Sequence, residues 1–190
     1  MRIIGGQFKG RQILPDRRLS LRPTTDFAKE GLFNILSGRY DMENIRALDL
    51  FAGTGSIAYE FVSRGAIDVH CVDIHPKHAA FIRSTAKQSG FNNIRVVRDD
   101  VFHFLSICKA TYDIVFADPP YETDNIATLP DAVLQADILA ANGTLIVEHS
   151  RRTDFSAHPL LTEQRHYGNV RFSFFKPPAS CIFTPPSTGL

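Results

Sequence analysis

Four consecutive residues in the second half of the sequence have the chemistry needed to hold an amino group. They are Asp118, Pro119, Pro120 and Tyr121, and they follow an apolar stretch at residues 114–117. Two consecutive prolines remove two N–H donors, so the Asp118 carboxylate and the Pro119 carbonyl form an acceptor-only pair. Tyr121 adds a flat ring on which a nucleobase can stack, which is worth about 1–3 kcal/mol in base-binding sites. The segment therefore predicts a site for the exocyclic amine of a base.

Such acceptors suit methyl transfer to that amine. The nitrogen is a poor nucleophile because its lone pair is delocalised into the ring. Acceptors that hold its hydrogens favour a pyramidal nitrogen and offset the positive charge that develops as the methyl group arrives, which stabilises the transition state more than the ground state. This chemistry needs neither a metal nor a cysteine nucleophile. We expect Asp118, Pro119 and Tyr121 to be the catalytic residues, and a tight proline turn is the alternative.

A glycine-containing loop at residues 49–56 has the features of a cofactor site. Its glycines let the backbone approach a ligand closely, and a following helix offers free N–H groups to an anion. The sequence lacks the third glycine of dinucleotide-binding loops and the G-K-[ST] of nucleoside triphosphate loops. What remains matches a site for S-adenosylmethionine, with a simple strand–helix turn as the alternative. The expected cofactor contacts are Asp49, Phe51, Ala52, Gly53, Thr54 and Gly55.

Two further aspartates follow apolar segments. Asp73 comes after residues 69–72 and can accept hydrogen bonds from two ribose hydroxyls, although it could also be a solvated loop residue. Asp99 and Asp100 follow residues 94–97, and the spacing to the next helix places Asp100 better than Asp99 to accept a hydrogen bond from the exocyclic amine of adenine. One of these two aspartates could instead cap that helix. Ligands of open α/β sheets bind beyond the carboxyl ends of the strands, so these groups together predict one cofactor site.

The elements that position these residues alternate between short apolar strands and helices. This pattern predicts an α/β fold with a parallel sheet that is covered on both faces. The strands are expected at 47–51, 69–72, 94–97, 114–117 and 144–147, and the helices at 57–63, 77–88, 101–109 and 126–139.

Different patterns occupy the two ends of the chain. Residues 2–4 and 11–14 flank a glycine-marked turn and predict a small N-terminal β-hairpin. Thr25 or Asp26 can cap a following amphipathic helix. Residues 163–167 and 170–175 flank Gly168-Asn169, which predicts a C-terminal antiparallel hairpin. We expect a hairpin extension at 1–22, a catalytic domain at 23–176 and a poorly ordered, proline-rich tail at 177–190.

The charge of this 190-residue chain is sorted by segment, although the formal net charge is only +1. Residues 1–22 hold six basic side chains against one acidic, and residues 150–176 hold five against two, whereas residues 23–149 hold 10 basic and 17 acidic side chains. A uniformly basic nucleic-acid-binding protein is thereby excluded. Basic segments on both sides of an acidic centre favour contact with RNA phosphates, with an ordinary solvated surface as the alternative.

Other features favour the cytoplasm. Cys71, Cys108 and Cys181 lie far apart, which predicts neither a disulfide framework nor a zinc site. The seven histidines show no metal-ligand spacing, so we expect them to be structural or surface groups and expect no bound metal. No signal peptide is expected, and no apolar run approaches the roughly 20 residues of a membrane span.

Taken together, these motifs resemble a known family. The loop at 49–56 with Asp118-Pro119-Pro120-Tyr121 resembles the class I S-adenosylmethionine-dependent amino-methyltransferases. The N-terminal motifs narrow the resemblance to RsmD, the bacterial family of small-subunit rRNA guanine-N2 methyltransferases, from residue 1 to about residue 176. Those motifs are Arg2-Ile3-Ile4-Gly5-Gly6, Lys9-Gly10-Arg11 and Arg22-Pro23-Thr24-Thr25-Asp26, continuing through Glu30 to Leu32-Phe33-Asn34.

The resemblance implies a seven-stranded, Rossmann-like methyltransferase sheet with helices on both faces. It implies methylation of the exocyclic N2 amine of a guanine in 16S rRNA, by a monomer, within an assembled or assembling small ribosomal subunit. S-adenosylmethionine would be the methyl donor and S-adenosylhomocysteine the product. The residues expected to contact RNA are Arg2, Lys9, Arg11, Arg22, Thr24, Thr25 and Asp26.

Two positions depart from the family pattern. Phe27 stands where the family often has arginine, which removes a phosphate contact. Gly31 interrupts the expected helix at a cost of about 1 kcal/mol relative to alanine, so this helix is expected to be looser.

Three other functions remain possible on the residues alone. DNA adenine-N6 or cytosine-N4 methylation uses the same amine chemistry but usually needs a separate recognition domain, for which 190 residues leave little space. Protein glutamine methylation is a second alternative, but relatives of that kind carry Asn where Asp118 stands. The third is a non-catalytic RNA-binding protein with a vestigial cofactor pocket, which the intact Asp118 and glycines disfavour.

Overall fold

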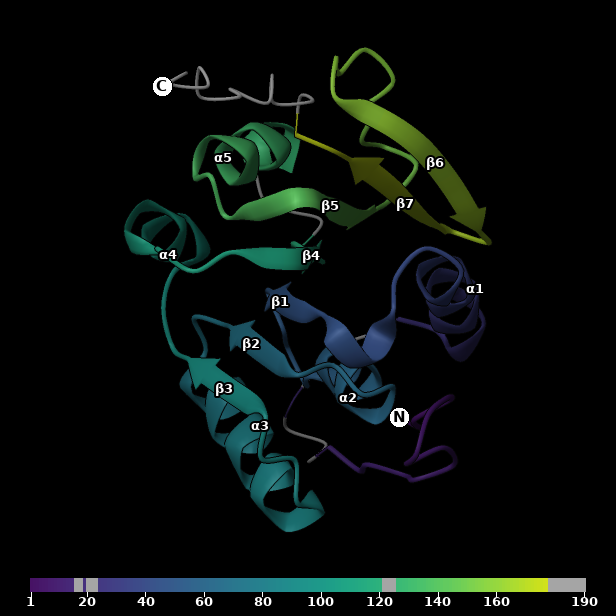
Figure 1. Ribbon diagram of the computed structural model, residues 1–190, viewed down its shortest axis with the longest axis vertical. Coiled ribbons are helices and arrows are strands. Elements are labelled where there is room, and N and C mark those ends of the chain that lie inside the picture. The colour runs from purple at the N-terminus through teal and green to yellow at the C-terminus, as the bar shows by residue number, and fades with distance from the viewer. Residues whose placement is uncertain (16–18, 20–23, 121–125, 178–190) are drawn as a thin grey trace, which may run out of the picture.

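A seven-stranded mixed sheet forms the centre of the protein in a computed structural model that describes residues 1–190 except 16–18, 20–23, 121–125 and 178–190 (Figure 1). The strand order is β3-β2-β1-β4-β5-β7-β6, and β7 runs in the direction opposite to the other six strands. The strands are β1 (Arg46–Leu50), β2 (Asp68–Val72), β3 (Ile94–Val97), β4 (Tyr112–Ala117), β5 (Leu139–His149), β6 (Leu161–Tyr167) and β7 (Val170–Phe175).

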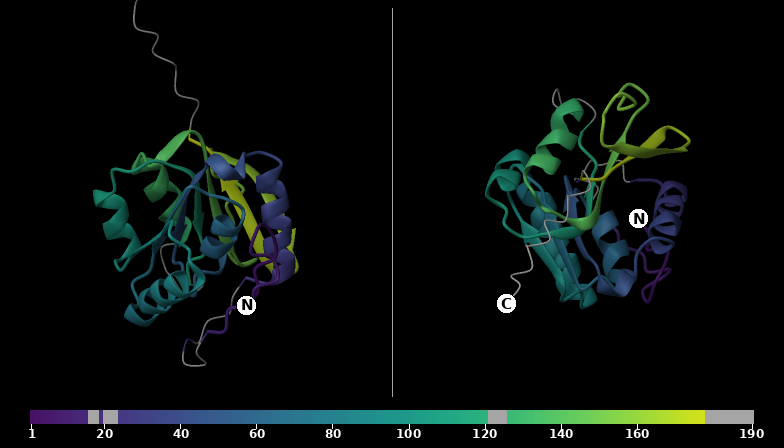
Figure 2. Two further views of the ribbon diagram at one scale, coloured as in Figure 1. Left: turned by 60° about the horizontal axis from the view of Figure 1, so that its bottom comes forward. Right: turned by 45° about the horizontal axis from the view of Figure 1, so that its top comes forward.

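Helices cover both faces of this sheet (Figures 1 and 2). Apolar side chains of α1, α2 and α3 build one buried core against the sheet, and those of α4 and α5 build a second core on the other face. Because both faces are buried, the central strands read as continuous apolar runs in the sequence. The helices are α1 (Asp26–Ser37), α2 (Ser56–Ser63), α3 (Pro76–Ser89), α4 (Val101–Ile107) and α5 (Leu129–Gln135), with short 3-10 turns at η1 (Met42–Asn44) and η2 (Ile126–Thr128).

The structure confirms the predicted seven-stranded α/β fold and its C-terminal hairpin, but two expected elements differ in extent. The helix expected at 126–139 is η2 followed by α5, which ends at Gln135; Asp137 has a left-handed φ of 53° that stops the helix, and β5 begins at Leu139. The expected N-terminal hairpin is present but short: Arg2 and Gln12 form an antiparallel bridge, and the backbone N–H groups of Ile3 and Ile13 donate to the carbonyls of Arg11 and Met1, both at 3.0 Å.

Helix α1 begins as predicted, with Thr25 as its N-cap. The Thr25 hydroxyl accepts a hydrogen bond from the backbone N–H of Ala28, at 3.2 Å. The helix buries its apolar face, including Leu32 and Leu36, in the core that it shares with α2. Because Thr25 also lines the main cavity described below, the cap fixes α1 at the edge of that cavity.

Gly31 on α1 leaves space for a neighbouring ring. A Cβ at this position would overlap the side chain of Tyr167, which comes from the end of β6. The expectation that Gly31 merely loosens the helix therefore misses its packing role, which the sequence could not show because the two residues are far apart in the chain. Phe27 lies beside the same ring, with 5.6 Å between the centroids of Phe27 and Tyr167.

We expect Gly31→Ala to destabilise the protein by about 1–3 kcal/mol, because the overlap with Tyr167 outweighs the higher helix propensity of alanine. Urea unfolding would measure the change. In a Tyr167→Ala background, the same Gly31→Ala substitution should become neutral or stabilising. A stabilising effect of Gly31→Ala in the wild-type background would show that Tyr167 does not require the glycine.

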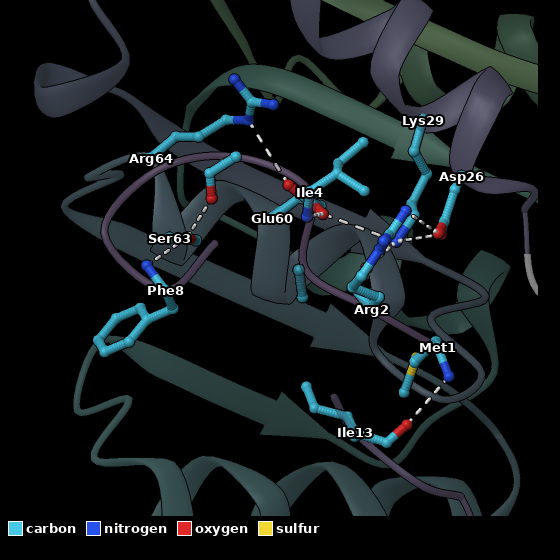
Figure 3. Close-up of polar contacts among 12 residues, drawn as sticks. Met1, Arg2, Ile4, Phe8, Ile13, Asp26, Lys29, Glu60, Ser63 and Arg64 are labelled. Carbon is cyan, nitrogen blue, oxygen red and sulfur yellow. Dashed lines mark hydrogen bonds and ion pairs between the residues drawn. The ribbon is translucent and has the colours of Figure 1, made fainter. Parts of the chain in front are cut away.

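The N-terminal segment packs along α2 (Figure 3). The backbone N–H of Ile4 donates to Glu60 Oε1 at 2.6 Å, and that of Phe8 donates to Ser63 Oγ at 3.0 Å. Ile3 is buried in the same core as α1 and α2. The basic N-terminal residues are thus carried by a segment that the body of the protein holds in place.

A buried ion pair joins this segment to α1 and α2 (Figure 3). Lys29 of α1 is 1% exposed and Glu60 of α2 is fully buried, with 3.6 Å between Lys29 Nζ and Glu60 Oε1. Lys29 Nζ also donates to the carbonyl of Arg2 at 2.7 Å. Burial raises the pKa of Glu60, while the charges of Lys29 and Arg64 act in the opposite direction. The pair therefore links three elements through one buried charge of each sign.

Across the residues that the structure describes, no helix has the length and apolar character to cross a membrane.

Candidate active site

A cavity of about 540 Å³ opens where β1, β2, β4 and β5 end, and its volume is typical of a small-molecule site. Among the predicted cofactor residues, Asp49, Phe51, Ala52, Gly53, Thr54, Asp73 and Asp100 line it, as do Asp118 and Pro119; Gly55 is not among its lining residues but precedes Ser56, which is. Tyr121 lies outside the described residues. The lining also includes Thr24, Thr25, Ser56, Ile57, Ile74, His75, His78, Val101, Phe102, Phe116, Pro120, Glu148, Ser150, Asn169 and Val170.

The loop between β1 and α2 is shaped by left-handed backbone. Gly53 and Gly55 have φ values of 55° and 77°, and Phe51 adopts 59°, a conformation that is rare for a residue with a side chain. A Cβ on Gly55 would come within 2.9 Å of the Tyr59 ring. The glycines therefore bring the backbone close to α2 and leave the loop open towards the cavity.

Ser56, the first residue of α2, carries an unused polar group at the cavity. Its Oγ is buried and, among the described residues, has no hydrogen-bond partner. A buried hydroxyl without a partner is costly, and the helix N-terminus around it favours an anionic group. This position fits the carboxylate of an amino-acid-like ligand.

Asp49 presents a buried acidic group near this position. Its Oδ2 accepts a hydrogen bond from the backbone N–H of Ala58 at 3.1 Å. Burial raises the pKa of Asp49 to about 8, and the nearby charges of Asp73 and Glu148 act in the same direction. A cation in the cavity would relieve this cost, so Asp49 fits the amino group of the same ligand.

Asp73 uses most of its acceptor capacity within the protein. Oδ2 accepts from the backbone N–H of Gly53 at 2.8 Å, while Oδ1 accepts from that of His75 at 2.8 Å and lies 3.0 Å from Nδ1 of His78. A carboxylate offers about four acceptor positions, so roughly one remains for a ligand. One hydrogen bond to a ribose hydroxyl fits this geometry better than the expected two.

Asp100 caps α4, which is one of the two roles that the sequence left open for it. Its Oδ1 accepts from the backbone N–H groups of Phe102 and His103 at 2.9 and 3.0 Å. The neighbouring Asp99 contacts the His103 ring instead. Asp100 still lines the cavity, and its Oδ2 has no hydrogen bond to a described residue. The cap orients the side chain and leaves one oxygen for the cavity.

A second carboxyl group accompanies Asp118 at the end of the sheet. Asp118 follows β4 and Glu148 belongs to β5, one position beyond the paired residues Ala117 and Val147. Glu148 is buried, and its Oε2 accepts a hydrogen bond from Thr24 Oγ1 at 2.8 Å. Burial raises the pKa of both groups, to about 7 for Glu148, and the charge of Glu148 raises that of Asp118 further.

The residues predicted to bind RNA separate into two sets. Thr24 and Thr25 line the cavity, where Thr24 is buried and donates a hydrogen bond to Glu148. Arg2 is exposed and forms an ion pair, at 3.1 Å, with the half-buried Asp26, the first residue of α1.

The other basic residues lie further along the N-terminal segment. Arg11 packs over the rings of Phe8 and Phe91 and donates to the carbonyl of Ser89 at the end of α3, whereas Lys9 is exposed. Arg22 lies outside the described residues. The N-terminal basic residues that the structure describes, Arg2, Lys9 and Arg11, thus lie between the start of α1 and the end of α3.

Glu148, Ser56 and His78 are among the polar residues of the cavity that sequence reasoning missed. Glu148 directly follows the apolar run 144–147, the same signal that identified Asp73 and Asp118, so it could have been found. Ser56 stands one position beyond the predicted cofactor set. The expectation that His78 is a structural or surface group overlooks its ring, which lies in the cavity against Asp73, and only the turn into α3 brings it there.

Within the described ranges, no three His, Cys, Asp or Glu side chains gather in a group that could hold a metal ion. Cys71 and Cys108 are both free.

The sheet topology, the loop after β1 and the acidic ends of β2 and β4 define a class I S-adenosylmethionine-dependent methyltransferase, and the solved structures with this fold agree. A putative methyltransferase from Escherichia coli, yhhF, superposes with a TM-score of 0.82 at 27% identity, covering 94% of this chain and 98% of that one. A hypothetical protein of Thermus thermophilus gives a TM-score of 0.81 at 27% identity, covering 93% and 99%.

Residues 1–176 match the model of the family described as Conserved hypothetical protein 95, and the chain belongs to this family. Ribosomal RNA small subunit methyltransferase D of Buchnera aphidicola is 26% identical, over 92% of this chain and 91% of that protein. Putative rRNA methyltransferase YlbH of Bacillus subtilis is 30% identical, over 93% and 98%. These findings confirm the resemblance to RsmD.

Proposed function

We propose that this protein transfers a methyl group from S-adenosylmethionine to the N2 amine of a guanine in 16S ribosomal RNA. The observation that carries the proposal is the acceptor-only end of β4, Asp118 and Pro119, in the same cavity as the loop after β1. The names of the relatives, ribosomal RNA small subunit methyltransferase D among them, support RNA as the acceptor.

The cavity residues fit S-adenosylmethionine by chemical type. The N–H groups at the start of α2 and the unpaired Ser56 hydroxyl suit its carboxylate, and Asp49 suits its amino group. The free acceptor position of Asp73 suits the ribose, and Asp100 Oδ2 suits the adenine amine. When bound, the cofactor supplies an electrophilic methyl group on a positively charged sulfur. No residue in this set requires a metal.

Asp118 and Pro119 are proposed to activate the guanine N2 amine that receives the methyl group. The Asp118 carboxylate and the Pro119 carbonyl each accept a hydrogen bond from the guanine N2 amine, and these two bonds turn the lone pair of the nitrogen towards the methyl donor. As the bond between the nitrogen and the methyl carbon forms, the bond from that carbon to the cofactor sulfur breaks, which leaves S-adenosylhomocysteine. The nitrogen gains positive charge, and the Asp118 carboxylate would stabilise that charge and accept the proton that leaves. Tyr121 is proposed to stack on the base.

The RNA is proposed to dock on the basic N-terminal residues Arg2, Lys9, Arg11 and Arg22. Arg2 stands beside α1, whose capping residue Thr25 lines the cavity, so a phosphate bound there would lie close to the entrance. We propose a monomer that acts in the cytoplasm on an assembled or assembling small subunit, where this RNA is found.

Methyl transfer to three acceptors side by side tests the proposal. Labelled S-adenosylmethionine would be offered with small ribosomal subunits, free 16S rRNA or duplex DNA. We expect label in one or both RNA acceptors and none in DNA. Label in DNA would favour the amino-methyltransferases of DNA, and no transfer despite cofactor binding would favour a non-catalytic RNA-binding protein.

Cofactor affinity should increase with pH. Asp49 is neutral below its raised pKa of about 8, whereas the positively charged cofactor favours the ionised carboxylate. Binding below pH 8 must therefore release a proton, so affinity should rise about tenfold or more between pH 6 and pH 8 and then level off. Calorimetry across this range would measure it, and Asp49→Asn should lose most of the dependence. A flat profile for the unmodified protein would contradict the role of Asp49.

A further inference from the structure

We propose that Glu148 selects guanine over other amino-bearing bases by accepting the N1–H of the base whose N2 amine Asp118 holds. This inference rests on the proposed function and adds a specificity-determining residue to it. Three observations support it: the position of Glu148 beside Asp118, the hydrogen bond that orients it, and the fit between two acceptors and the edge of guanine.

The first observation is the register of the two strands that deliver the carboxyl groups. Phe116 pairs with Ile146 and Ala117 with Val147, so Asp118 and Glu148 are the next residues on two adjacent parallel strands. Both line the cavity. The effect of the Glu148 charge on the pKa of Asp118 agrees with this proximity. The site therefore presents two carboxyl groups side by side rather than one.

The second observation is the orientation of Glu148. It is 3% exposed, and Thr24 Oγ1 donates to its Oε2 at 2.8 Å. Within the described residues Oε1 receives no hydrogen bond, so this oxygen is the one that can serve a ligand in the cavity. Thr24 lies one residue before the cap of α1 and lines the cavity itself. The side chain is thus held from one side and free on the other.

The third observation is chemical. Guanine presents two adjacent donors, N1–H and the N2 amine, to a pair of acceptors. In adenine and cytosine the ring nitrogen next to the amine is an acceptor, which would face a carboxylate oxygen without a hydrogen between them. A site built to hydrogen-bond a particular donor strongly rejects an analogue that lacks it, because its own buried group is left unpaired. Two carboxyl groups therefore favour guanine.

A single-base substitution in the RNA tests the inference. Small-subunit RNA would carry guanine or 2-aminopurine at the methylated position; 2-aminopurine keeps the amine at position 2 but has an acceptor in place of N1–H. The unmodified protein is expected to methylate guanine about a hundredfold faster. Glu148→Gln supplies an amide that can donate to this acceptor, so the preference should fall to less than about tenfold. Glu43→Gln, on the exposed η1 turn, should keep the full preference.

The ratio of the methylation rate on guanine to that on 2-aminopurine, rather than either rate alone, tests the role of Glu148. Equal rates on the two bases with the unmodified protein would overturn the role of Glu148. So would a Glu148→Gln variant that slows both bases equally and keeps their ratio, because a purely structural role predicts that result. If the unmodified protein methylates neither base yet binds S-adenosylmethionine, the proposed function fails and this inference fails with it.

Discussion

Replacing Asp118 by asparagine should lower the turnover number of methyl transfer by about a hundredfold or more. Removal of one preorganised electrostatic group that acts in a transition state typically has an effect of this size. Asparagine keeps the shape of the side chain but replaces a carboxylate oxygen with an NH₂ group, which cannot accept a hydrogen from the guanine amine. It also removes the charge that offsets the positive nitrogen. Cofactor affinity should change little, because other residues are proposed to hold the cofactor.

The raised pKa of Asp118 makes this substitution informative. Burial, and then the charges of Glu148 and Asp49, favour the protonated acid in the free protein. The Asp118→Asn amide resembles that neutral form, so full activity in the variant would mean that the carboxylate is not the working species. Asp113→Asn is the matched control: Asp113 lies on β4, the strand that Asp118 follows, and its Oδ2 accepts from the backbone N–H of Arg46 at 2.8 Å, where an amide oxygen can replace it.

Replacing Lys29 by methionine should reduce the free energy of unfolding by about 3–5 kcal/mol, since one partner of a buried ion pair is then left without compensation. Glu60 would retain Arg64, whose Nε is 3.6 Å from Oε2, but would lose the charge of Lys29. The carbonyl of Arg2 would lose its donor. A domain of this kind is stable by about 5–15 kcal/mol in total, so the loss would be severe.

Urea unfolding measures this effect, and two further variants define its cause. Adding Glu60→Gln to Lys29→Met should restore part of the stability, because the buried charge disappears while the amide oxygen can still accept from Ile4. Lys87→Met, at an exposed position in the last turn of α3, should change stability by less than about 0.5 kcal/mol. Amide hydrogen exchange at Ile4 and Phe8 should accelerate in Lys29→Met. Unchanged stability of Lys29→Met would show that the ion pair of Lys29 and Glu60 contributes nothing to the free energy of unfolding.

The sequence predicts the sheet well because both faces of the central strands are buried and each strand is an apolar run. The sequence also predicts where some strands end, because an aspartate directly follows the apolar run, as Asp73 and Asp118 do. It misplaces the end of the helix near Gln135 because Asp137 stops that helix by its backbone conformation, which no apolar pattern reveals.

Contacts between distant segments lie beyond such reasoning. Thr24 and Glu148 are 124 positions apart, and only the fold shows that a threonine expected to bind RNA orients a carboxyl group in the cavity. Helix propensity alone predicts the wrong effect for Gly31, because the contribution of this glycine to stability depends on the space that it leaves for the Tyr167 side chain. In both cases the meaning of a residue is set by a side chain from another element.

We propose that the amine held at Asp118 belongs to guanine in ribosomal RNA. The most direct measurement is to methylate small ribosomal subunits and free 16S rRNA from cells that lack this activity, digest the RNA to nucleosides and identify the product by mass spectrometry. We expect N2-methylguanosine as the sole new nucleoside, absent when Asp118→Asn replaces the unmodified protein. A product methylated on adenine or cytosine, or N2-methylguanosine formed equally well by Asp118→Asn, would contradict it.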